Sequence, residues 1–473
     1  MDPLLDVLKE AGEAVIRLFA LPYIYIAIAM VWWHARQGVI LQRRLFHVRL
    51  YGSLSLTLSR LGAGVAVGLV LSAASFGVGA KLNSDTILCI WLAMFVLAVF
   101  RLRYICLAYA AGAIGVAQAI ARKTLPDGYD GLFARSFEAL GGVDIASLLF
   151  LAGLLHIAEG LLVRFQSSKM AIPLFMEGKR GKPVGAYALS GVWPIPLLWL
   201  IPSASSAEGF TLPWAPLLGD GAASWALLAF PVLIGFSDRT ETFWPEQKAR
   251  ASGNALILYG ALVAALAAGA QWWTPLGVIA AVAAFLLHEG LVLWSRWREK
   301  GRNPIFAQDG SGVKVLAVLP GTPAAEMGLV AGETIKKLNG SIVRTKEQLH
   351  AALQLQSAFC KMEVVNRDGH VKFVQRARYA GEHYQLGLVL APDEDVDFVA
   401  APRSASIWQG LRNAGARPRN GASWQAAQAE LAAARELDAA KEAEREAAEA
   451  AAAALAEPEV DPGLPPRKER KNS

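Results

Sequence analysis

The chain has 473 residues, of which 54% are hydrophobic and 18% are charged, and its formal net charge is +6. A soluble protein carries about 25% charged residues, so this composition excludes an ordinary soluble enzyme and favours a membrane protein. The positive charge does not predict binding to nucleic acid, because the basic residues mostly flank apolar segments, where membrane topology accounts for them.

The N-terminus and the cysteines exclude two further classes. The first 17 residues are acidic rather than basic and precede no small-residue cleavage site, so no cleavable signal peptide is expected. The three cysteines form no Cys-x-x-C pair, which argues against a disulfide framework and against a cysteine zinc site.

Long apolar runs fill residues 18–294 and predict a polytopic α-helical membrane domain with eight or nine spans. With eight spans, residues 1–20 would lie on the inner surface and one segment would be re-entrant or interfacial. Pro22, Pro194, Pro196 and Pro231 are expected to kink their helices. The nine expected spans lie near residues 18–33, 61–80, 86–100, 104–120, 143–163, 184–202, 223–236, 254–271 and 275–294.

Lysine and arginine are retained on the cytoplasmic side of a membrane, so their distribution predicts orientation. Nine spans would place every strongly basic loop on one side, with the N-terminus outside and the C-terminal region cytoplasmic. Those basic loops are residues 34–60, 101–103, 164–183, 237–253 and 295–303.

Two stretches resemble each other and suggest an internal repeat of a membrane-exit motif. Residues 154–181 read LLHIAEGLLVRFQSSKMAIPLFMEGKRG, and residues 286–312 read LLHEGLVLWSRWREKGRNPIFAQDGSG. Four expected spans separate the two histidines, so both stretches would leave the membrane on the same side. Convergence without duplication is the alternative explanation.

His288-Glu289 matches the start of the zinc-protease pattern H-E-x-x-H, but Val292 occupies the position of the second histidine. We therefore expect no metal site, no cofactor and no catalytic set. The interpretation we favour for His156, Glu159, His288 and Glu289 is hydrogen bonding between helices, with a glutamate paired to arginine or to a loop amide. A role in transport or catalysis is the alternative, since ionisable residues in membrane helices are often functional.

Residues 312–392 predict a separate α/β domain. The pattern indicates a strand at 313–319, a helical turn at 323–327, a tight turn at Asn339-Gly340, a helix at 346–356, a hairpin about Asp368-Gly369 and a last strand at 384–390. Residues 295–311 would be a basic linker before this domain. After it we expect a linker over 393–423, an Ala/Glu-rich helix over 424–456 and a basic disordered tail over 457–473.

Several spaced segments of this domain resemble a bacterial PDZ domain of the circularly permuted type. They are Gly321-Thr322-Pro323-Ala324-Ala325, Gly328-Leu329, Gly332-Glu333-Thr334-Ile335 and Leu338-Asn339-Gly340. The resemblance implies that a peptide would add as a strand beside the last strand and against helix 346–356. The implied peptide-binding residues are Gln385, Leu386, Gly387, Leu388, Val389, Leu390, Leu349, His350 and Leu353. Core packing is the alternative role for Leu349 and Leu353.

The order of features over residues 15–395 resembles the MinJ family, the membrane PDZ proteins of division-site selection in Gram-positive rods. The residues that carry this resemblance are Leu155-His156 with Glu159, Lys179-Arg180-Gly181, Trp193-Pro194-Ile195-Pro196-Leu197, His288-Glu289 and the PDZ domain that follows.

The resemblance to the MinJ family implies a non-enzymatic adaptor in the cell membrane, enriched at septum and poles. Its protein partners would be the polar protein DivIVA and the MinC–MinD inhibitor of FtsZ assembly. One alternative is a PDZ-bearing regulator of proteolysis related to intramembrane proteases, and another is a transporter with a polar cavity near the bilayer midplane.

Overall fold

The computed structural model describes residues 3–46, 48–124, 131, 134–178, 181–203, 209–218, 224–355, 358–377, 379 and 386–393. The expected tail helix at 424–456 and the basic tail at 457–473 lie outside the described residues. The helices of the first part are α1 (Pro3–Ala20), α2 (Tyr23–Phe46), α3 (Ser53–Val78), α4 (Ser84–Phe100), α5 (Leu107–Thr124), α6 (Ala134–Gly141), α7 (Ile145–Leu162), α8 (Pro245–Gly269) and α9 (Pro275–Lys300), with short turns η1 (Leu102–Tyr104) and η2 (Val163–Ser167).

Five helices among the described residues are long and apolar enough to cross a membrane. They are α2, α3, α7 with its continuation η2, α8 and α9, and α4 is a shorter apolar helix. The protein is therefore a multi-pass membrane protein. Pro22 stands where α1 ends and α2 begins, because a proline cannot continue the hydrogen bonding of a helix interior.

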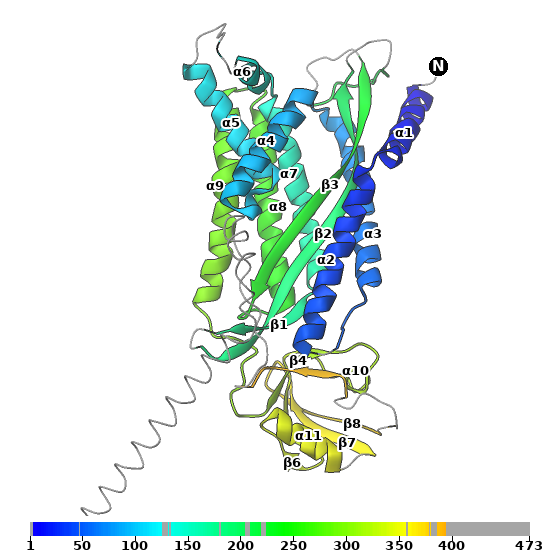
Figure 1. Ribbon diagram of the computed structural model, residues 1–473, viewed down its shortest axis with the longest axis vertical. Coiled ribbons are helices and arrows are strands. Elements are labelled where there is room, and N and C mark those ends of the chain that lie inside the picture. The colour runs from blue at the N-terminus through cyan, green and yellow to red at the C-terminus, as the bar shows by residue number, and fades with distance from the viewer. Residues whose placement is uncertain are drawn as a thin grey trace, which may run out of the picture. The chain divides into compact units, whose positions relative to one another are not determined.

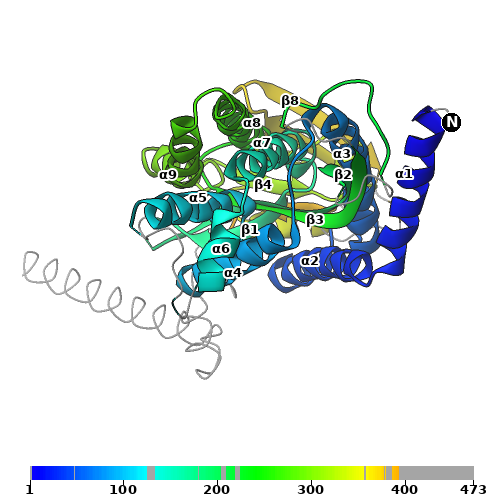
Figure 2. The ribbon, with the colours of Figure 1, turned by 90° about the horizontal axis from the view of Figure 1, so that it is seen from above.

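Two segments predicted as membrane helices are strands instead. Residues 184–202 fall in β2 (Pro183–Pro202) and residues 225–236 in β3 (Trp225–Thr240). The two strands pair as an antiparallel hairpin, and β1 (Ile172–Glu177) pairs with the start of β2. The helical prediction was wrong because both strands are apolar at most positions and lack a period of two in hydropathy. Strand β2 is covered on both faces, and the exposed Leu233 of β3 is itself apolar. The hairpin runs lengthwise along the helices (Figure 1) and passes between α2–α3 and α7–α8 (Figure 2).

Contrary to the prediction, the prolines of β2 do not kink a helix. They lie on the edge of β2 that α3 covers. The amides of Leu198 and Leu200 donate to the hydroxyl oxygens of Ser72 (2.9 Å) and Ser75 (3.3 Å) on α3. Pro194 and Pro196 occupy the preceding alternate positions of β2 and have no N–H that needs a partner. This arrangement satisfies an edge that lipid would leave unpaired, since every backbone polar group at membrane depth needs a partner within the protein.

The second part of the chain is the α/β domain, called the sheet domain below. Its strands are β4 (Val313–Val318), β5 (Thr334–Leu338), β6 (Ser341–Ile342), β7 (Phe359–Val365), β8 (Val371–Ala377) and β9 (Leu388–Leu390), and its helices are α10 (Pro323–Glu326) and α11 (Lys346–Leu355). The strand order is β8-β7-β5-β4-β9, with β6 paired to β5. The elements follow the predicted order, and Asn339 adopts the left-handed conformation that its tight turn requires.

The chain passes directly from α9 into contacts with the sheet domain. Helix α9 continues to Lys300, so residues 295–300 of the expected linker are helical. Phe306 is fully buried, and its carbonyl accepts a hydrogen bond from the amide of Gly185 at the start of β2. The hydroxyl of Tyr187 in β2 donates to the carbonyl of Leu316 in β4. These contacts attach one side of the sheet domain to the membrane part.

Candidate functional site

The two similar stretches bring their histidines together. Helices α7 and α9 run in the same direction (Figure 1), as a same-side exit requires. The rings of His156 on α7 and His288 on α9 lie with their centroids 5.1 Å apart and at 84° to each other. Duplication of the motif remains a prediction, but its two copies meet in one site.

His156 is 3% exposed and is held from several sides. Its Nδ1 lies 2.7 Å from the carbonyl oxygen of Ala152, one turn earlier on α7. Its Nε2 lies 3.4 Å from Sγ of Cys106 and 3.7 Å from the carboxylate of Glu159. Helical spacing of three residues puts His156 and Glu159 on one face of α7.

Glu289 makes an interhelical pairing of the expected kind. Its carboxylate accepts hydrogen bonds from the Arg103 guanidinium and from the Tyr109 hydroxyl at 3.0 Å. Arg103 lies in η1, the turn between α4 and α5, so this turn contacts the middle of α9. At 1.5 Å per residue, Glu289 is about 16 Å from the C-terminal end of α9. Arg103, which the sequence placed in a basic topological loop, thus also neutralises Glu289.

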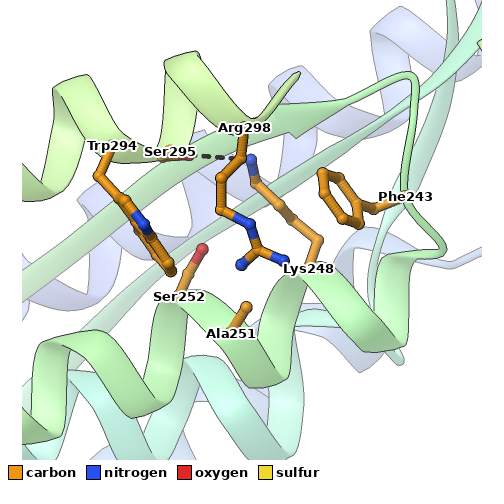
Figure 3. A pocket seen from close by; sticks show the side chains of 7 residues that line it. All are labelled: Phe243, Lys248, Ala251, Ser252, Trp294, Ser295 and Arg298. Atoms are coloured by element: carbon orange, nitrogen blue, oxygen red, sulfur yellow. Dashed lines mark hydrogen bonds between the residues drawn. The ribbon is translucent and has the colours of Figure 1, made fainter. Parts of the chain in front are cut away.

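A second polar cluster closes the lower ends of α8 and α9. Lys248 on α8 is 4% exposed, and its Nζ donates to the Ser295 hydroxyl at 2.8 Å and the Glu299 carboxylate at 3.0 Å. The Arg298 guanidinium covers the rings of Trp294 and Phe243 at 4.8 Å each, beside a small pocket (Figure 3). The basic C-terminal end of α9, where the chain leaves the membrane part, is therefore held by buried contacts as well as by charge.

The sheet domain places two of the implied peptide-binding residues in an unusual loop. Leu386 and Gly387 have φ angles of +58° and +81°, and a Cβ on Gly387 would overlap Thr322. The carbonyl of Leu386 accepts from the Ala324 amide, and that of Gly387 from the Leu319 amide, both at 2.9 Å. The loop is thus held against the start of α10.

The remaining implied residues are mostly buried. Leu349 and Leu353 on α11 belong to the core of the sheet domain together with Leu386 and Leu388, so they have the packing role that the sequence left open. Val389 faces a different cluster, which includes Tyr187 of β2. Leu390 and His350 are half-buried, and Gln385 lies outside the described residues.

Sequence reasoning overlooked Cys106 and Lys248. Cys106 belongs to no Cys-x-x-C pair, and its neighbours at 156 and 288 are remote in sequence. Lys248 was counted as one charge of a topological loop. Lys248 lies in the first turn of α8, in a polar stretch of the sequence, so no local signal set it apart from the other charges of that loop.

The fold therefore defines a multi-pass membrane protein with a C-terminal α/β sheet domain. No family model matches the chain. It is 30% identical over 403 residues to the cell division topological determinant MinJ of Bacillus subtilis (strain 168), covering 85% of this chain and 98% of that protein. It is 26% identical over 260 residues to a probable MinJ of Lacticaseibacillus paracasei, covering 53% of this chain and 66% of that protein. The chain belongs to the MinJ family of cell division topological determinants.

Proposed function

We propose that this chain is a membrane-anchored adaptor in division-site selection and that its sheet domain is a PDZ domain facing the cytoplasm. The lysine and arginine distribution supports that orientation. By resemblance to the family, the adaptor would connect DivIVA at poles and septa with MinD and thereby restrict FtsZ assembly. The family is named for division topology rather than for a reaction, which supports a non-enzymatic role.

The peptide-binding proposal rests on the loop at Leu386-Gly387. Both of its carbonyls are used inside the sheet domain, and its amides are the donors that a C-terminal carboxylate would need. Strand β9 follows at once and stands at the end of the strand order. A peptide bound by the loop could therefore continue as an added strand, with α11 beside it.

A shallow hollow that includes Leu319 supports a ligand that ends in a carboxylate. It is lined by Arg43, Val48, Arg49 and Leu319, and Leu319 is the residue whose amide holds Gly387. Two arginines, from the end of α2 and the following loop, thus line a hollow that shares Leu319 with the backbone contact of Gly387. Arginine is well suited to bind carboxylates because its planar fork can donate two hydrogen bonds. The membrane part would then help to form the peptide site.

The test is the localisation of a full-length fluorescent fusion in a rod-shaped host of the family, together with cell length. The variants are a deletion of 312–392 and the substitution Gly387→Ala, which introduces strain at a positive φ and a clash with Thr322. We expect wild type at septa and poles in cells of normal length. Both variants should spread over the membrane and lengthen the cells.

Gly369→Ala is the matched control. Gly369 also has a positive φ, of +85°, but a Cβ there meets nothing within 4 Å, and it lies in the β7–β8 turn. It should leave localisation and cell length unchanged at equal protein levels. Normal localisation and division in the deletion strain would overturn the proposal.

A further inference from the structure

Three side chains that can bind a metal converge from three separate elements of the membrane part. Cys106 directly precedes α5, His156 lies on α7 and His288 lies on α9. One ligand atom from each lies within 4.8 Å of the others. Thiolate and imidazole are the donors that zinc prefers, so the chemistry of the set is that of a zinc site.

His156 is oriented as a metal-binding histidine is. A carbonyl oxygen can only accept a hydrogen bond, so the contact between Nδ1 and the Ala152 carbonyl places the proton of the neutral ring on Nδ1. The lone pair is then on Nε2, which points at Sγ of Cys106 at 3.4 Å. In metal-binding histidines, the N–H of the second ring nitrogen commonly donates a hydrogen bond to a carbonyl or carboxylate in this way.

His288 provides an independent observation. Its Nδ1 is buried and has no hydrogen-bond partner among the described residues. The ring is enclosed by Tyr109, Tyr259 and His156, with centroids 4.5, 5.4 and 5.1 Å away. A thiol–imidazole hydrogen bond would account for Cys106 and His156, but it leaves this nitrogen unexplained. A bound metal would account for all three side chains.

The carboxylates nearby have different roles. Glu289 is already neutralised by Arg103. Glu159, one turn after His156, has its carboxylate 3.7 Å from Nε2 of that histidine. Zinc bonds of about 2.0 Å to nitrogen or oxygen and 2.3 Å to sulfur place tetrahedral ligand atoms about 3.3–3.6 Å apart. The observed 3.4 Å between Nε2 of His156 and Sγ of Cys106 needs little adjustment, and a ligand atom of His288 lies within 4.8 Å of both.

We propose that Cys106, His156 and His288 bind a Zn²⁺ ion, with the Glu159 carboxylate beside His156. The thiolate and the carboxylate balance the charge of the ion, which matters because an unpaired charge inside the membrane part is costly. The ion would clamp α7 to α9 and to the start of α5.

The test is the zinc content of the full-length chain, purified in detergent with a tag that lacks histidine and dialysed against a weak chelator. We expect about one zinc per chain in wild type. Cys106→Ser and His288→Gln should each lower the zinc content at least about tenfold at the same free zinc concentration. Cys89→Ser is the matched control, because Cys89 is a half-buried cysteine on α4 outside the cluster, and it should retain the zinc.

Replacement of zinc by Co²⁺ in wild type and in Cys89→Ser tests the ligand set even where the other variants fail to fold. We expect the intense d–d absorption of a tetrahedral site together with a thiolate-to-cobalt charge-transfer band. Zinc content in wild type no higher than in Cys106→Ser would overturn the proposal. Cobalt binding to wild type without a thiolate band would do the same.

Discussion

Gly64 of α3 lies directly against the carbonyl oxygen of Pro194 in β2, so closely that a Cβ on Gly64 would overlap that oxygen. One turn later Gly68 has the same relationship to Pro196. Small residues four apart let a membrane helix approach its neighbour closely. Here the neighbour is a strand edge, and the approach brings Ser72 and Ser75 within reach of the next amides of β2.

Gly64→Ala should destabilise the protein, because the added methyl group must push α3 away from β2. Overpacking of this kind costs about 1–3 kcal/mol. Gly62→Ala is the control on the same helix, since a Cβ there meets nothing within 4 Å, and it should leave the stability unchanged or slightly higher. Thermal unfolding in detergent measures both. Equal stability of the two variants would show that α3 does not approach the strand this closely.

Ser75→Ala tests whether side chains of α3 satisfy the edge of β2. The Ser75 hydroxyl is fully buried, and it lies 3.2 Å from the Leu198 carbonyl and 3.3 Å from the Leu200 amide. Its loss should leave backbone groups unpaired, at about 1–3 kcal/mol in unfolding free energy. Ser55→Ala, at an exposed position of α3, should be neutral. A neutral Ser75→Ala would mean that this edge has other partners.

The sequence predicted where the apolar segments of the membrane part lie better than it predicted whether each is a helix or a strand. Pro194 and Pro196 stand at alternate positions, which is a strand-edge pattern, but the surrounding residues are apolar at every position because β2 is buried on both faces. Length and hydropathy then favour a helix. In the sheet domain, exposed and partly buried residues alternate along β8, and Gly and Asn mark the turns, so local signals were sufficient there.

The candidate site could not be assembled from the sequence because its members meet only through helix packing. The zinc-protease pattern that begins at His288 requires a second histidine at position 292, one turn away, and Val292 stands there. The structure instead brings in His156, 132 residues earlier, and Cys106 from a turn between helices. The similarity of the two histidine stretches was the available signal, but it carries no information on which faces of α7 and α9 meet.

Glu289→Leu should be strongly destabilising, because it leaves the Arg103 guanidinium largely buried without its carboxylate. Breaking one half of a buried ion pair costs about 3 kcal/mol or more. The double variant Arg103→Met, Glu289→Leu should recover most of this loss, since the apolar pair leaves no buried charge. Glu13→Gln breaks an exposed pair with Arg17 on α1 and should change the unfolding free energy by at most about 0.5 kcal/mol. Additive losses in the double variant would contradict direct pairing.

Lys248→Met should loosen the end of α9 where the chain enters the sheet domain. Lys248 is buried between Asp238 of β3, at 3.4 Å, and Glu299 of α9, at 3.0 Å. Without the ammonium group, two carboxylates face each other in a partly buried site, a loss of about 3 kcal/mol.

Protease cleavage within 301–312 measures this loosening, because the segment becomes accessible when the last turns of α9 detach. We expect faster cleavage in Lys248→Met than in wild type. Lys337→Met is the control: it removes a half-exposed partner of Glu363 in the sheet domain, far from α9 in sequence, and should leave the cleavage rate unchanged. Equal rates in all three proteins would show that the Lys248 cluster does not hold the exit of α9. The proposed peptide site would then depend on other contacts, such as those of Tyr187 and Phe306, for its position near the membrane part.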